Sequence, residues 1–230
     1  MQDAINWFLK IIKYPIALAC AFFAFPLLKA LIYFISATFS MKVAMYFLLP
    51  VIGVVVLWNL IPGLAGSSLA IFVHEATHML AAILTFHKPK GMSIEQDKGG
   101  SFSYQGKGNW LITIAPYFIP TFPLLWMLMG VFLEQKNSFE LWYIIGFGIV
   151  VGFHIAANFS QIHSEQTDFK KVGYFFTMLF IPGSNLLLIG YLWGFALKGW
   201  SGLSLWHQYI TPACQEFMND ILKYIQQLFA

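Results

Sequence analysis

Long runs of apolar residues constrain the fold of this chain more than any other feature. Six runs approach the ~20 residues that a helix needs to cross the apolar core of a bilayer. Of the 230 residues, 59% are hydrophobic and only 10% are charged, whereas about a quarter of a soluble domain is charged. We therefore expect an all-α polytopic membrane protein with about six transmembrane helices in one domain, residues 1–230. The expected spans are residues 15–37, 43–61, 66–86, 110–133, 141–160 and 173–197.

The remaining composition argues against several other classes of protein. The net charge of +3 is small and its lysines are scattered, so no nucleic-acid partner is expected. Cys20 and Cys214 match neither a disulfide pattern nor a zinc-ligand spacing. The first residues lack the basic region and the cleavage site of a removable signal peptide. The chain is thus expected to be an integral, multi-pass membrane protein.

Two segments at the ends of the chain are amphipathic. Residues 4–12 are expected to lie at the membrane interface before the first span. A second helix is expected at residues 211–229, because proline at position 212 is favoured at the first helical position. Apolar residues then recur at helical spacing, at Phe217, Ile221, Leu222, Ile225 and Leu228. This helix is too polar to span a bilayer, so we expect it to lie on the membrane surface or to pack on a partner.

The third expected span contains the sequence His-Glu-Ala-Thr-His at residues 74–78. Residues four apart lie on one face of a helix, so His74 and His78 can hold the same metal ion. Glu75 is then directed to the side where a metal-bound water would lie, which is the physical basis of the zinc metalloprotease motif. Ionisable groups at membrane depth are costly and usually functional. The motif therefore predicts a catalytic Zn²⁺ site within the membrane.

A catalytic zinc ion usually has three protein ligands and a water, so a third ligand must come from another segment. After the third span, two further crossings would return the chain to the same face. The segment that follows them contains four polar candidates, and a fifth lies one turn earlier inside the span. These candidates are Asn158, His163, Glu165 and Asp168, and within the span His154.

Two features between the motif and this segment bear on the substrate. Alternating residues around Gly99 and Gly100 predict a β-hairpin at about residues 91–105. The edge of such a hairpin can bind an extended peptide by strand addition. The fourth span contains Pro116, Pro120 and Pro123, which predict a kinked or broken helix.

Taken in this order, the motifs resemble the site-2 protease family of intramembrane zinc metalloproteases. The resemblance covers about residues 66–175, the expected catalytic core. In that family, the two motif histidines and an aspartate in a later Asn-x-x-Pro…Leu-Asp-Gly segment hold the zinc ion. The resemblance implies that His74, His78 and Asp168 are the ligands and that Glu75 is the catalytic base. It also implies that Asn158 binds the substrate or the oxyanion.

The later segment departs from the family pattern. No proline follows Asn158, the spacing to Asp168 is longer, and Phe169 replaces the expected glycine. Two alternative metal ligands therefore remain open in the sequence. His154 is buried in an apolar span, and Glu165 would complete the two-histidine, one-glutamate set of other zinc enzymes.

The expected activity is hydrolysis of peptide bonds in transmembrane or hydrophobic peptides, with Glu75 as general base. One alternative is a non-proteolytic zinc-binding membrane protein, such as a transporter or an assembly factor. Metal binding alone does not require Glu75, which argues against that alternative. A second alternative is an intramembrane metalloprotease of another type, such as a prenyl-protein protease, with Glu165 as a ligand.

The distribution of lysines indicates which face of the membrane the site opens to. With six crossings, the lysines on the site face would outnumber those on the opposite face. The first group is Lys42, Lys88, Lys90, Lys98, Lys107, Lys170 and Lys171, and the second is Lys10, Lys13, Lys136, Lys198 and Lys223. Because cytosolic loops carry the excess of lysine, we expect the site to open to the cytosol of a bacterial cell.

Overall fold

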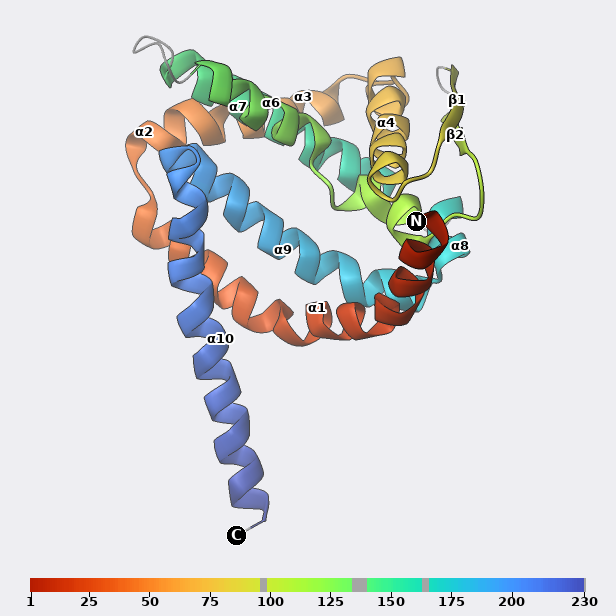
Figure 1. Ribbon diagram of the computed structural model, residues 1–230. Helices are drawn as coiled ribbons and strands as arrows, with labels where there is room; N and C mark the ends of the chain where they lie inside the picture. Colours follow the sequence, from red (N-terminus) through yellow and green to blue (C-terminus); the bar gives the residue numbers. More distant parts are fainter. Residues whose placement is uncertain (96–98, 134–139, 163–165, 230) are drawn as a thin grey trace.

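The computed structural model describes residues 1–95, 99–133, 140–162 and 166–229, and most of them are helical (Figure 1). The predicted all-α membrane fold with one small hairpin is confirmed. The helices are α1 (Gln2–Thr38), α2 (Met41–Val43), the π-helix η1 (Ala44–Leu48), α3 (Leu49–Leu60), α4 (Ser68–Leu84), α5 (Trp110–Ile114), the 3-10 helix η2 (Ala115–Tyr117), α6 (Thr121–Leu133), α7 (Glu140–Gln161), α8 (Thr167–Val172), α9 (Tyr174–Lys198) and α10 (Ser201–Leu228). The antiparallel hairpin consists of β1 (Pro89–Glu95) and β2 (Gly99–Tyr104).

Helix α1 runs without a break from Gln2 to Thr38, so the expected interfacial segment and the first span form one helix. Pro15 and Pro26 lie inside it. Each proline removes one backbone hydrogen bond and bends the helix. Figure 1 shows α1 curving along one side of the molecule. Proline therefore bends this helix and does not end it, and the interfacial position of residues 4–12 stays a prediction.

Four helical stretches of the described residues are long and apolar enough to cross a membrane. They are α1, Met41–Leu60, Leu141–Gln161 in α7, and α9. A fifth crossing is possible for the pair formed by Trp110–Tyr117 and Thr121–Val131, which is bent by 81°. Pro120 lies in the break and Pro123 in the first turn of α6, as the predicted kink requires. Helix α4, with 17 residues, is shorter than a full span.

Contacts near the N-terminus bear on the position of helix α4. The side chain of Asn6 donates a hydrogen bond to the carbonyl of Lys107 and lies 3.4 Å from the ring of His87. His87 and Lys107 therefore lie on the N-terminal face. If helix α1 and the stretch Met41–Leu60 each cross once, they return the chain to that face before α4. Helix α4 would then begin and end on the same face.

This topology changes the expected distribution of lysines. The ammonium of Lys13 donates a 2.7 Å hydrogen bond to the carbonyl of Val172, at the end of α8. Lys10 and Lys13 therefore lie on the same face as the segment after α7. Lys42 and Lys198 line one cavity on the opposite face, together with Ile144. The expected positions of Lys10, Lys13 and Lys42 are therefore wrong, because Lys13 contacts the end of α8 and Lys42 shares a cavity with Lys198.

The largest core cluster lies where α1, η1, α7, α9 and α10 meet. Its buried aromatic members are Phe34, Phe47, Phe147, Trp193, Phe195 and Trp206. Two glycines allow α7 to approach its neighbour closely. A Cβ on Gly148 would lie 2.6 Å from the carbonyl oxygen of Phe47, and one on Gly152 would lie 2.8 Å from that of Val51. Small residues serve this purpose in membrane helix pairs.

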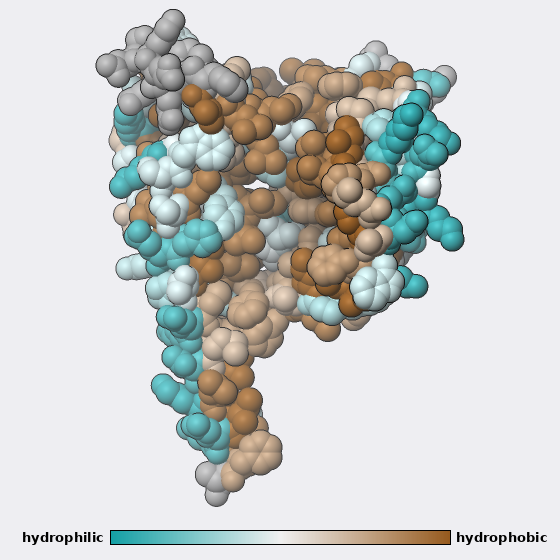
Figure 2. All heavy atoms as spheres, viewed as in Figure 1, coloured by the Kyte–Doolittle hydropathy of each residue, from teal (hydrophilic) through white to brown (hydrophobic). Residues whose placement is uncertain are grey.

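Helix α10 begins at Ser201, well before the predicted start at Thr211, and Pro212 lies inside it. It projects from the body of the molecule (Figure 1) and carries a polar and an apolar face (Figure 2). The predicted amphipathic helix is confirmed, but its predicted start is wrong. Helix α9 ends at Gly199, which has φ of 57°, and α10 begins two residues later. The turn at Gly199, and not Pro212, therefore initiates α10. Its position on the membrane surface or on a partner stays a prediction.

Candidate metal centre

The first two candidate ligands lie on helix α4. Its N-terminus is capped by Ser67, whose hydroxyl accepts a hydrogen bond from the backbone N–H of Ala70. One helical turn separates His74 from His78, and their Nε2 atoms lie 3.1 Å apart. Glu75 also lies on α4 and is buried, with 7% of its surface exposed. The helix thus places two imidazoles and one carboxyl group on one side of the protein.

The third candidate ligand comes from α8. Asp168 lies in the first turn of this short helix, and its Oδ2 atom is 3.5 Å from His74 Nε2 and 3.4 Å from His78 Nε2. Burial alone would raise the pKa of the Asp168 carboxyl group. The rings of His74 and His78, which lie beside this carboxyl group, outweigh burial and hold its pKa below its usual range. The cluster therefore combines two imidazoles with an ionised carboxylate.

The donor set fits a tetrahedral metal ion. One ligand atom from each of His74, His78 and Asp168 lies within 4.8 Å of the others. At the bond lengths of a tetrahedral zinc site, neighbouring ligand atoms are about 3.3 Å apart. The three observed separations, 3.1, 3.4 and 3.5 Å, lie close to this value. The residues present could therefore hold Zn²⁺ with one coordination position left for water.

Each candidate ligand is held by a partner from a different part of the chain. The Nδ1–H of His74 donates a 2.6 Å hydrogen bond to Oε1 of Gln161, and that of His78 donates a 2.7 Å bond to the carbonyl of Ile112. Because a neutral imidazole has one N–H, both Nε2 lone pairs face the cluster. The hydroxyl of Tyr117 donates to Asp168 Oδ2 at 3.2 Å.

Sequence reasoning missed these supporting residues. Gln161 is polar at the end of an apolar span, which is a weak signal because span ends are commonly polar. Tyr117 is fully buried and follows Pro116 at the break between η2 and α6. The Ile112 carbonyl is a backbone group and leaves no trace in the sequence. Their roles depend on contacts between distant segments.

The candidate ligands line a cleft of about 670 Å³. One wall is formed by α4, another by α8, and a third by β2 of the predicted hairpin. Strand β2 approaches α4 very closely at Gly100. A Cβ at this position would lie 2.6 Å from Cγ2 of Ile71 and 2.7 Å from Cγ of Glu75. Glycine at this position is therefore required for the observed packing of the Glu75 side chain.

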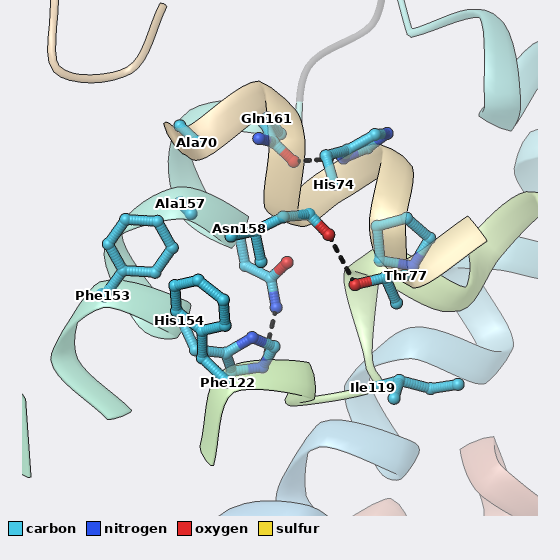
Figure 3. A pocket seen from close by; sticks show the side chains of 12 residues that line it. Ala70, His74, Thr77, Ile119, Phe122, Phe153, His154, Ala157, Asn158 and Gln161 are labelled. Carbon is cyan, nitrogen blue, oxygen red and sulfur yellow. Dashed lines mark hydrogen bonds between the residues drawn. The ribbon is translucent and has the colours of Figure 1, made fainter. Parts of the chain in front are cut away.

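A much smaller cavity of about 20 Å³ lies beside the cleft and shares His74 and Gln161 with it. Figure 3 shows that Asn158 and His154, both on α7, point into this small cavity. The amide nitrogen of Asn158 lies 3.1 Å from Nε2 of His154. Such a cavity has room for about one water molecule.

The structure thus separates the expected site residues into two groups. His74, His78, Glu75 and Asp168 line the cleft, whereas Asn158 lines the small cavity behind His74. Among the described residues, His154 lies outside the cluster of possible ligands. The alternative ligand Glu165, like His163, falls outside the described residues.

Comparison with known proteins identifies the family. The family model described as Peptidase M50B-like matches residues 46–164, which is just over half of the chain. The match includes His74, Glu75, His78 and Asn158 and ends four residues before Asp168. No curated protein and no solved structure matches the chain significantly. The M50 family consists of metal-dependent membrane peptidases, so the resemblance to site-2 proteases is confirmed and the chain belongs to the Peptidase M50B-like family.

Proposed function

We propose that this protein is an intramembrane zinc protease in which His74, His78 and Asp168 hold the metal ion. The observation that carries the proposal is the meeting of these three donors with Glu75 in one cleft. The donors come from two segments that are ninety residues apart in the sequence. Two imidazoles and a carboxylate at tetrahedral spacing form a donor set that suits zinc.

Glu75 is the proposed general base. Its carboxyl group lies in the same cleft, and Glu75 directly follows the proposed ligand His74 in the sequence. A zinc ion supplies two kinds of chemistry at such a site, activation of water and polarisation of the scissile carbonyl group. Glu75 accepts the proton of the attacking water and then donates it to the nitrogen of the leaving amine. The cleaved peptide bond thus gives one carboxylate and one amine.

Asn158 has a different role in this proposal from the one the family resemblance implies. It lines the small cavity, and its amide nitrogen contacts His154, one turn earlier on the same helix. Tyr117 lies closer to the proposed ligands, through its hydrogen bond to Asp168. We therefore assign Asn158 to the support of the cavity behind His74.

The proposed substrates are transmembrane or hydrophobic peptides. The cleft lies in a protein that crosses the bilayer several times, and many of its outward side chains are apolar (Figure 2). A helical substrate must unwind before its peptide bonds become accessible. Strand β2 lines the cleft next to Glu75, where an unwound peptide can add to its edge as an extra strand.

The distribution of lysines supports a cleft that opens to the cytosol, as in the cytoplasmic membrane of a bacterium. Among the described lysines, most lie on the face that carries the N-terminus and α8, and few lie on the opposite face. The first group is Lys10, Lys13, Lys88, Lys90, Lys107, Lys170 and Lys171, and the second is Lys42 and Lys198. Lys29 lies within α1, and Lys223 lies on the projecting α10. Positive residues accumulate on the cytosolic side of membrane proteins.

Metal analysis of two variants tests the ligand set. We expect purified wild-type protein to contain one zinc ion per chain, and Asp168→Ala to lose most of it. The matched control is His154→Ala, which removes a histidine that lies outside the cluster. A control that lost zinc while Asp168→Ala kept it would contradict the proposed ligands. Zinc bound without cleavage of any membrane peptide would favour the non-proteolytic alternative.

A further inference from the structure

Gln161 is the last residue of α7 and lies between the two cavities beside the metal centre. Its Oε1 atom accepts the 2.6 Å hydrogen bond from Nδ1–H of His74. Figure 3 shows this bond at the rim of the small cavity. The contact joins residues that are 87 positions apart in the sequence, so it depends on the packing of α7 against α4.

We infer that Gln161 is a positioning residue that fixes the tautomer and the ring orientation of His74. This inference rests on the proposed zinc site. Donation from Nδ1 leaves the lone pair of His74 on Nε2, the atom that lies 3.5 Å from Asp168 Oδ2. Partners of this kind orient metal-binding histidines and raise their basicity.

Among the two histidines, only His74 is oriented by a side-chain amide, which a substitution can remove. His78 is oriented by the backbone carbonyl of Ile112, which no substitution removes. Nearby polar side chains are engaged elsewhere, since Thr77 bonds to Thr121 and Asn158 contacts His154. Among the described residues, Gln161 is therefore the group placed to hold His74.

Zinc affinity of two full-length variants tests the inference, measured by competition with a chromophoric chelator in detergent. Gln161→Leu keeps a similar volume but has no acceptor, and we expect it to bind zinc about 10-fold more weakly than the wild type. Gln161→Glu keeps an acceptor and should bind at least as tightly as the wild type. A glutamate accepts and does not donate, so this rescue would identify Nδ1 as the donor.

Ser160→Ala is the matched control, since the Ser160 hydroxyl donates to the carbonyl of Ala157 and not to the site. Its zinc affinity should equal that of the wild type, and the thermal unfolding of the metal-free variants checks that each is folded. Wild-type affinity in Gln161→Leu would overturn the inference. Equal weakening in the leucine and glutamate variants would also overturn it, since packing alone would then explain the loss. A wild-type protein without zinc would instead refute the proposed function.

Discussion

Replacement of Gly100 by alanine should disturb the proposed base without removing the metal. The added Cβ would lie 2.6 Å from Cγ2 of Ile71 and 2.7 Å from Cγ of Glu75. Ordinary contacts of a Cβ begin at 3.4 Å, so these distances are 0.8 and 0.7 Å too short. Such overpacking typically costs about 1–3 kcal/mol, and the side chain of Glu75 must shift to relieve it. A misplacement of about 1 Å in an active site can lower the rate roughly 100-fold.

We therefore expect kcat of Gly100→Ala to fall about 10- to 100-fold, because Glu75 no longer faces the attacking water. The zinc content should stay at the wild-type level, because neither Ile71 nor Glu75 is a proposed ligand. The assay is cleavage of a fluorescent transmembrane peptide in detergent, with the zinc content of the same samples measured in parallel.

The matched control is Gly91→Ala on the neighbouring strand, where a Cβ would meet only the hydroxyl of Ser103, at 3.8 Å. This variant should retain the wild-type rate. A Gly100→Ala variant with wild-type kcat would refute the reasoning that β2 holds Glu75 in place. Loss of zinc from Gly100→Ala would also contradict it, since the hairpin would then support the ligands.

Three further perturbations have defined outcomes. Tyr117→Phe removes the hydroxyl that donates to Asp168, and one such hydrogen bond contributes about 1 kcal/mol, so zinc affinity should fall roughly fivefold in a chelator competition. Prolonged dialysis against a strong chelator should abolish cleavage, and added Zn²⁺ should restore it. Activity that survives the removal of all metal would contradict the assignment as a metalloprotease. Gly202→Ala should lower the free energy of unfolding by about 1–3 kcal/mol, because its Cβ would overlap the backbone of Gly194 where α9 and α10 cross. Unchanged thermal unfolding would show that the two helices can separate there without cost.

The part of the site that the sequence predicts best depends on local periodicity. His74, Glu75 and His78 are close in the chain, and one helical turn is enough to bring the two imidazoles together. The hairpin around Gly99 and Gly100 follows from alternating residues and a turn signal in the same way. Asp168 was reached through the topology and the family resemblance, since its distance from the histidines is set by the whole fold.

The features that the sequence did not predict depend on tertiary contacts. The hydrogen bonds of Gln161 and Tyr117 to the site exist only because α7 and η2 pack against α4 and α8. Helix α4 is apolar enough to be taken for a span, yet with 17 residues it is shorter than the four candidate spans. Pro212 has the signal of a helix start, but the turn at Gly199 begins the helix earlier. In each case, the packing of neighbouring helices determines the outcome.

The most direct test of the proposed chemistry compares the wild type with Glu75→Gln for both zinc content and peptide cleavage. This substitution keeps the size of the side chain and removes the group that accepts a proton. We predict that Glu75→Gln binds one zinc ion per chain, like the wild type, but does not cleave a transmembrane peptide that the wild type hydrolyses. Cleavage by Glu75→Gln at the wild-type rate would contradict the mechanism.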